Sequence, residues 1–164
     1  MCIRDSNYTA STRLILKQCG LSDEDIDNRL IKVHGEASNN DIIFGVEDNA
    51  GIKKEHVFLR KAYNIKYKAL NFSELYDRIK SVAIFGHSLG ETDHTYFNKL
   101  FQESCMYNKF STNNNKEFWL FYYKENDYHC MMQQLDSLTH NSLTSFRQYN
   151  RVNFINTDKE KVFI

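Results

Sequence analysis

Three things are missing from this sequence, and each absence excludes something. No proline occurs among the 164 residues. An average chain has about 5% proline. The absence of proline, together with abundant asparagine, lysine, isoleucine and tyrosine, therefore indicates mutational bias. Neither sign of charge is in excess, because 21 Lys and Arg balance 21 Asp and Glu, whereas a dedicated nucleic-acid binder usually carries a basic excess. No window approaches the roughly 18 apolar residues of a membrane span, so we expect neither a nucleic-acid nor a membrane partner.

Cysteines are few and widely separated. None of the four belongs to a CxxC pair, which excludes a zinc ribbon and a thioredoxin-type redox pair; they are Cys2, Cys19, Cys105 and Cys130. No secretory h-region follows Met1, and nothing else indicates an oxidising compartment. We expect reduced thiols in a cytoplasmic protein, mostly as core filler. We expect no bound metal, because the histidines show no ligand spacing.

The apolar content supports a real core. Hydrophobic residues make up 41% and aromatic residues 14%, which is enough for one folded domain at this length. Residues 1–6 (MCIRDS) match no helix or strand pattern and resemble a translated adapter or assembly scar, so we exclude them from the fold. Residues 7–164 are then the C-terminal part of a single α/β domain, and the native chain extends further towards the N-terminus.

Helical and strand patterns alternate along the chain. Apolar, β-prone runs predict strands at 29–33, 42–44, 81–85, 117–123 and 151–155. Helical spacing predicts helices at 10–19, 57–68, 72–80, 91–104, 128–138 and 143–149, and the acidic segment 21–28 is interpreted as a loop or a single turn. The run 81–85 is typical of a strand buried on both faces, and 117–123 of a central one. The fold class is therefore α/β and Rossmann-like, a mostly parallel sheet with flanking helices that lacks its N-terminal strand or strands.

Two candidate sites follow predicted strands. In parallel sheets, ligands bind at the carboxyl ends of the strands. His34 and Gly35 come directly after the strand at 29–33, and the loop 86–90 (GHSLG) comes after the strand at 81–85. A histidine in the first position is more often a hydrogen-bonded structural residue than a catalyst.

The loop 86–90 also matches the G-x-S-x-G nucleophile elbow of serine hydrolases. Asp127 or Asp136 with His129 or His140 are available as acid and base. However, an elbow helix needs small residues after its second glycine, and residues 91–94 (ETDH) are large or charged. No HGGG-type oxyanion segment precedes the loop. The hydrolase is therefore the least favoured interpretation.

A structural role for Ser88 is favoured over the nucleophile. Ser88 and Glu91 have the S-x-x-E spacing of a helix capping box, which contributes on the order of 1 kcal/mol. A helix N-terminus with a glycine-rich entry also attracts phosphate. The same loop could therefore cap a helix and hold a nucleotide phosphate or ribose.

The order of several short motifs resembles the bacteriophage abortive-infection protein AbiH family. The motifs are Asn7-Tyr8-Thr9, Val33-His34-Gly35, residues 42–48 (IIFGVED) and residues 84–97 (IFGHSLGETDHTYF). The likeness covers nearly all of the chain from Asn7 onward. It implies a protein of antiphage defence, in which a strand and a GNGFD-like turn would precede Asn7.

AbiH-like sequences in turn look distantly like sirtuin-type NAD-binding domains. This likeness implies that His34 is the catalytic histidine, that Asn7 lies near the nicotinamide ribose, and that Gly86 and Ser88 contact NAD. The surrounding motifs complete the implied NAD-binding set with Gly35, His87, Leu89 and Asp93.

The departures from sirtuins change the implied reaction. Thr9 stands where sirtuins have an aspartate, and no zinc module is present. Cleavage of NAD at its glycosidic bond is therefore implied in place of deacylation, with NAD as substrate of the full-length protein, and this piece alone is expected to be inactive. NAD depletion would halt the host before the phage matures. A non-catalytic module that senses a nucleotide or a phage component is the alternative, and the phage trigger and oligomeric state stay open.

Overall fold

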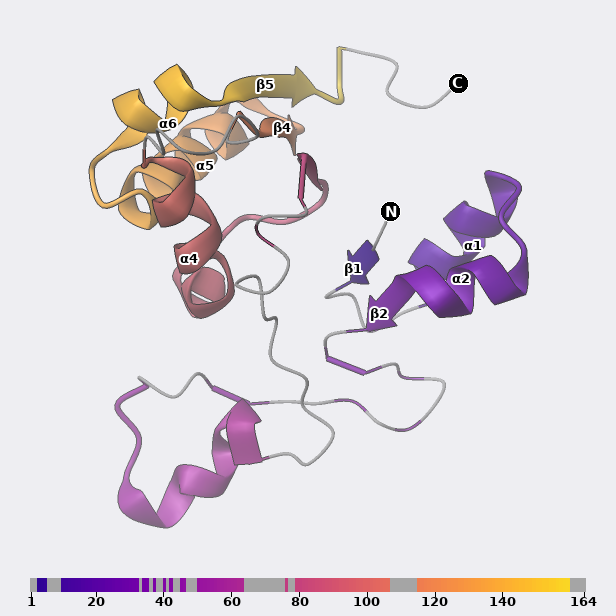
Figure 1. Cartoon of the computed structure of the whole chain (residues 1–164). Coiled ribbons are helices and arrows are strands. Elements are labelled where there is room, and N and C mark those ends of the chain that lie inside the picture. The colour runs from indigo at the N-terminus through magenta and orange to yellow at the C-terminus, as the bar shows by residue number, and fades with distance from the viewer. Residues whose placement is uncertain are drawn as a thin grey trace. The chain divides into compact units, whose positions relative to one another are not determined.

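The computed structural model describes residues 3–5, 10–32, 34–35, 37, 40, 42, 45–46, 50–63, 76, 79–106 and 115–159. The chain forms two compact units, Met1–Leu70 (unit 1) and Asn71–Ile164 (unit 2) (Figure 1). The sequence predicts one domain from residue 7 onward.

Unit 1 contains a short parallel strand pair and two helices. Strand β1 pairs with β2 in parallel, with Ile3 opposite Leu30. The elements are β1 (Ile3–Asp5), α1 (Ser11–Gln18), α2 (Asp23–Arg29) and β2 (Leu30–Lys32). The exclusion of residues 1–6 from the fold was therefore wrong for Ile3–Asp5. The strand is three residues long and its partner lies far along the chain, so no local pattern reveals it. The end predicted for α1 is confirmed, since Gly20 follows it with φ +85°.

Helix α2 occupies the segment that the sequence indicated as a loop. The Ser22 side chain accepts a hydrogen bond from the Asp25 N–H (3.1 Å), which caps the helix. The acidic residues of the first turn, Asp23, Glu24 and Asp25, lie where a helix N-terminus favours negative charge. The prediction of a loop or a single turn was wrong, because it took these acidic residues as loop-formers in a segment that forms a seven-residue helix.

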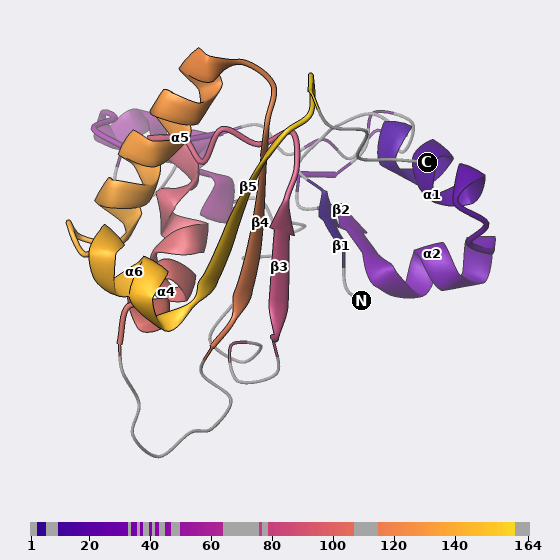
Figure 2. The ribbon, with the colours of Figure 1, turned by 90° about the horizontal axis from the view of Figure 1, so that it is seen from above.

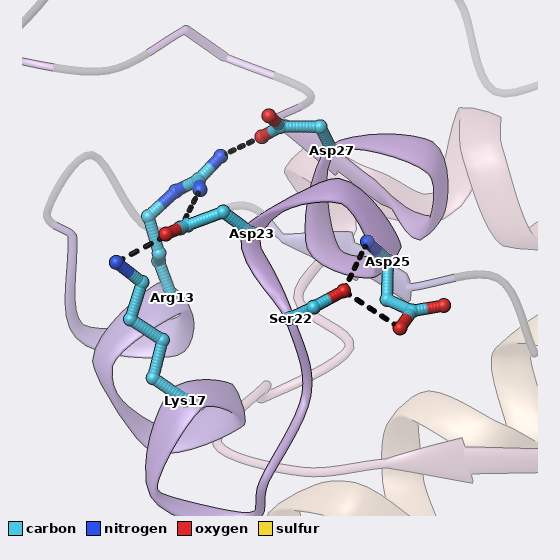
Figure 3. A network of polar contacts seen from close by, with 6 residues as sticks. All are labelled: Arg13, Lys17, Ser22, Asp23, Asp25 and Asp27. Carbon is cyan, nitrogen blue, oxygen red and sulfur yellow. Dashed lines mark hydrogen bonds and ion pairs between the residues drawn. The ribbon is translucent and has the colours of Figure 1, made fainter.

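Charged side chains connect α1 to α2 (Figure 3). The Arg13 guanidinium on α1 forms ion pairs with Asp27 and Asp23 of α2. One of its nitrogens lies 3.1 Å from the Asp23 carboxylate. The Lys17 ammonium lies 2.8 Å from the same Asp23 carboxylate. These pairs are exposed, and α1 has no buried residue.

The rest of unit 1 is described only in pieces. Two 3₁₀-helices, η2 (Lys54–Leu59) and η3 (Lys61–Tyr63), replace the start of the α-helix predicted at 57–68. Val46 forms a parallel bridge with Arg60. Most of the strand predicted at 42–44, of the helix at 72–80 and of the remainder of 57–68 lies outside the described residues.

Unit 2 confirms the predicted parallel α/β arrangement. Its sheet has the order β3-β4-β5, all parallel, with β4 in the centre. The strands are β3 (Ser81–Ile84), β4 (Glu117–Tyr122) and β5 (Arg151–Asn156), and the helices are α4 (His94–Ser104), α5 (Glu125–Leu138) and α6 (Leu143–Tyr149). All six match predicted segments to within a few residues.

The three helices of unit 2 lie on one face of its sheet (Figure 2). Each crossover moves one strand further in the same direction, so connections of the usual right hand place their helices on the same side. The core lies between this face and the helices, and includes Phe118, Leu120, Leu100, Phe101, Leu135 and Phe146, all fully buried.

Burial along β3 and β4 alternates. Phe118 and Leu120 are buried, whereas Trp119 between them is half-buried. On β3, Ile84 is buried but Ala83 is exposed, and Phe85 just beyond the strand is 55% exposed. The prediction of a strand buried on both faces was therefore wrong for β3, because the α-helices described in unit 2 lie on one face of the sheet.

Candidate ligand-binding loop at the carboxyl end of β3

The loop 85–93 begins where β3 ends, at the carboxyl end of the parallel sheet. It brings together five of the predicted site residues, Gly86, His87, Ser88, Leu89 and Asp93. Gly86 has φ +65° and Leu89 has φ +55°. The left-handed conformation costs a residue with a side chain roughly 1–2 kcal/mol. The Leu89 side chain is fully buried in the core, and this burial holds the strained turn in place.

His87 joins the two halves of this loop. Its Nδ1 accepts a hydrogen bond from the Leu89 N–H at 2.9 Å. Its Nε2 lies 3.3 Å from Oδ2 of Asp93, and its ring meets the Phe97 ring edge-on with centroids 5.3 Å apart. Because Nδ1 accepts, the proton of the neutral ring belongs on Nε2 and points to Asp93. Both ring nitrogens are therefore engaged inside the protein.

Ser88 lies exposed at the tip of the loop. A Cβ atom added to Gly90 would stand 3.4 Å from the Ser88 Oγ, which is ordinary van der Waals contact. Gly90 belongs to the predicted motif but was not among the predicted site residues. The repeated glycine of G-x-S-x-G was the signal that could have found it.

The predicted capping box between Ser88 and Glu91 was wrong. A 3₁₀ turn, η5 (Glu91–Asp93), precedes α4, and the Asp93 N–H donates to the Gly90 carbonyl oxygen (2.8 Å). Helix α4 therefore starts at His94, with Asp93 and not Ser88 at its N-cap position. The Asp93 side chain does not cap the helix by a hydrogen bond to one of its first N–H groups. The extra turn moves the start of the helix away from Ser88 and frees its hydroxyl from that role.

The groups available for a serine-hydrolase triad are engaged elsewhere. His129 is exposed and lies 3.8 Å from Glu125, and His140, beyond the far end of α5, contacts Gln102 at 2.9 Å. The Asp127 carboxylate accepts from the Lys124 N–H at the start of α5. In the part of the chain that the structure describes, none of these groups is hydrogen-bonded to Ser88.

The other predicted site residues belong to unit 1. His34 comes just after β2 and is only 6% exposed. Gly35 beside it has φ +74°, a conformation that glycine adopts without strain. Asn7 lies outside the described residues. His34 belongs to unit 1 and the loop 85–93 to unit 2.

The thiols that the structure describes lie outside residues 85–93 in the sequence. Cys19 and Cys130 are exposed thiols. Burial raises the pKa of the Cys105 thiol, which donates to the Phe101 carbonyl oxygen at 3.2 Å. Within the described ranges, no three His, Cys, Asp or Glu side chains converge as metal ligands. None of the helices described is long and apolar enough to cross a membrane.

Comparison with known proteins identifies one family. A family model described as "Bacteriophage abortive infection AbiH" matches residues 5–114, which is more than half of the 164-residue chain and includes the whole loop 85–93. No curated protein and no solved structure matches the chain. The match contains the motifs around His34 and Ser88 on which the predicted resemblance depended. The chain belongs to the bacteriophage abortive-infection AbiH family.

Proposed function

We propose that this protein acts in abortive infection by binding NAD at the loop 85–93 and hydrolysing it with the help of His34. Membership of the AbiH family supports the role in abortive infection. The observation that carries the ligand assignment is the loop 85–93, in which His87 Nδ1 accepts a hydrogen bond from the Leu89 N–H. The loop lies at the carboxyl end of a parallel strand, where ligands of such sheets bind.

The chemistry of the loop suits a nucleotide. Gly86 and Gly90 have no side chains to block the approach of a ligand, and nothing lies within 4 Å of where a Gly86 Cβ would stand. The exposed Ser88 hydroxyl can donate to a phosphate or exchange hydrogen bonds with a ribose. Helix α4 starts directly after the loop, and a helix N-terminus favours negative charge.

Hydrolysis of NAD needs one proton acceptor. The oxygen of a water molecule bonds to C1′ of the nicotinamide ribose while the bond from C1′ to the nicotinamide nitrogen breaks and nicotinamide leaves with its electron pair. The proton lost from the water passes to a base. Histidine suits this role near neutral pH. The likeness to sirtuin-type domains implies that His34 takes this proton and that Asn7 orients the ribose or the water without adding charge.

The test uses cells that carry the gene in its complete reading frame. Phage protection and intracellular NAD would be followed after infection for the wild type, His34→Ala and Ser88→Ala. His34→Ala should lose both protection and NAD depletion, because general-base catalysis contributes roughly 10²–10⁴-fold. Ser88→Ala should be milder, since it removes about one hydrogen bond, roughly 0.5–1.5 kcal/mol. His129→Ala is the matched control, because this histidine is 67% exposed and lies on α5. Constant NAD during protection by the wild type would contradict the proposal.

A second candidate is a sensor that binds the nucleotide without cleaving it. It is favoured by the loop's own geometry, since His87 is fully engaged and Ser88 has no hydrogen-bonded base among the residues described. A sensor depends on binding alone. Ser88→Ala should then weaken protection while His34→Ala leaves it intact, which is the reverse of the order expected for catalysis.

A further inference from the structure

We infer that His87 is a positioning residue, which acts through the backbone of Leu89 to hold the Ser88 hydroxyl towards the ligand. This rests on the proposed function, in which the loop 85–93 binds NAD. The predicted site placed His87 among the groups that contact NAD, whereas the structure turns both of its nitrogens towards the protein.

The first nitrogen closes a small turn around Ser88. The bond from the Leu89 N–H to His87 Nδ1 joins residue i+2 to side chain i, as an asparagine does in an Asx-turn. Ser88 is the residue between the two bonded groups. Leu89 itself has φ +55°, and its side chain is fully buried, so the core holds the residue whose N–H closes the turn. Closing the turn therefore fixes the backbone that carries the exposed Ser88 hydroxyl.

The second nitrogen ties the same turn to the start of α4. His87 Nε2 faces the Asp93 carboxylate at 3.3 Å, and the Asp93 N–H returns to the Gly90 carbonyl oxygen. Phe97, one turn into the helix, packs edge-on against the ring. The ring thus has one orientation, with neither nitrogen left to meet a ligand.

Two conservative variants separate these two contacts. His87→Asn places its side-chain oxygen near the position of Nδ1, so it can still accept from the Leu89 N–H, but it is too short to reach Asp93. His87→Gln places its amide nitrogen near the position of Nε2, so it can donate to Asp93 but does not close the turn. If His87 acts through Leu89, asparagine rescues binding and glutamine does not. A direct ligand contact would predict that both variants fail.

The experiment is calorimetric titration with NAD of the protein expressed from its complete reading frame. His87→Ala and His87→Gln should each weaken binding about tenfold, the equivalent of one lost hydrogen bond, and His87→Asn should stay within about twofold of the wild type. Ser88→Ala should have little further effect in the His87→Ala background, because two residues that act through one turn are not additive. His94→Ala is the control, since His94 bonds Gln134 on α5 at 2.8 Å, and its affinity should be unchanged.

The possible failures are distinct. Equal weakening by His87→Asn and His87→Ala, or a full Ser88→Ala effect in the His87→Ala background, overturns the positioning role. A wild type that binds no NAD overturns the proposed function, and with it the ligand assigned to Ser88. The NMR chemical shift of the Leu89 amide then tests, without a ligand, whether His87 closes the turn. It should be retained in His87→Asn and lost in His87→Gln, and any other pattern contradicts the inference.

Discussion

Different interactions stabilise each of the two units of this protein. In unit 2, the core cluster joins the sheet to all three helices through fully buried side chains such as Phe101, Leu120 and Leu135. In unit 1, Ile26 is the one buried residue of the two described helices, and Leu14 and Ile15 on α1 are 60% and 50% exposed. Exposed ion pairs connect α1 to α2 instead (Figure 3).

The difference sets the scale of what a substitution can do in each unit. Burial of a large apolar side chain contributes about 1.5–3 kcal/mol, whereas an exposed ion pair contributes about 0–1 kcal/mol. The candidate loop 85–93 shares the stability of unit 2, because Leu89 is part of its core. The position of Ser88 therefore depends on the packed core of unit 2.

The largest effect is expected from Phe118→Ala. Phe118 stacks on Phe101 with ring centroids 5.5 Å apart and meets Phe146 edge-on at 4.8 Å. Removing a buried aromatic ring costs about 3–5 kcal/mol, because it loses both transfer energy and packing. Urea unfolding followed by the fluorescence of Trp119, the only tryptophan, would measure it on the same strand.

Phe58→Ala is the matched control in unit 1. Phe58 is 64% exposed, so its removal should change the free energy of unfolding by less than about 0.5 kcal/mol. Equal effects of the two substitutions would mean that the contrast between the units is wrong. A small effect of Phe118→Ala alone would mean that the core around Phe118 can collapse into the space.

Sequence patterns predicted unit 2 well because its elements are amphipathic. Helix α6 has the predicted bounds, and α5 buries Met131, Leu135 and Leu138 at helical spacing. In unit 1, α1 and β2 lie within predicted segments, but the pattern missed α2. Helix α2 has Ile26 as its single buried residue, and what marks it is its cap, Ser22, with the acids that follow.

The candidate loop was located correctly at a strand end, but its internal geometry could not be predicted. The left-handed conformation of Leu89 follows from tertiary burial, and a branched apolar residue gives no sign of it in the sequence. The hydrogen bond that His87 Nδ1 accepts from the Leu89 N–H depends on the backbone of this loop. The 3₁₀ turn η5 shifts the start of α4 away from Ser88. The predicted roles of His34 and Asn7 in NAD cleavage stay predictions.

A smaller effect is expected from Asn150→Ala, which tests polar rather than apolar burial in unit 2. The Asn150 amide donates to the carbonyl oxygens of Ser104 (2.7 Å) and Phe146 (2.8 Å), and its oxygen accepts from the Lys116 N–H (3.2 Å). One buried side chain thus joins the ends of α4 and α6 to the start of β4. Leaving these groups without their partner should cost about 1–3 kcal/mol in urea unfolding.

Asn153→Ala on strand β5 is the control for that substitution. The Asn153 amide is half-buried and makes one long contact, 3.4 Å, with the Phe118 carbonyl oxygen, so little should be lost. Asn150→Asp sharpens the test. A carboxylate can still accept from the Lys116 N–H, but it turns an acceptor towards the Ser104 and Phe146 carbonyl oxygens, and should destabilise at least as much as alanine. A neutral Asn150→Ala would show that water replaces the amide.

The smallest effect is expected in unit 1, where acid should weaken the contact between α1 and α2. The hydrogen bond from the Lys17 ammonium, and after it the Arg13 guanidinium, lowers the pKa of Asp23. A lowered pKa stabilises the fold above the ordinary value for aspartate, about 3.9, and this contribution disappears as the pH falls through the lowered value. An NMR titration of the Asp23 carboxyl carbon should show the shift directly, and Lys17→Met should move its pKa back towards the ordinary value.

Lys99→Met is the control, because Lys99 pairs with Glu103 on α4 and should leave Asp23 unchanged. About 0.5 M salt should shrink the Asp23 shift, because it shortens the screening length to roughly 4 Å, whereas the Phe118→Ala effect should be the same at either ionic strength. An Asp23 pKa insensitive to Lys17→Met would show that another group, such as Arg13, lowers it, and that the Lys17–Asp23 pair does not connect the two helices.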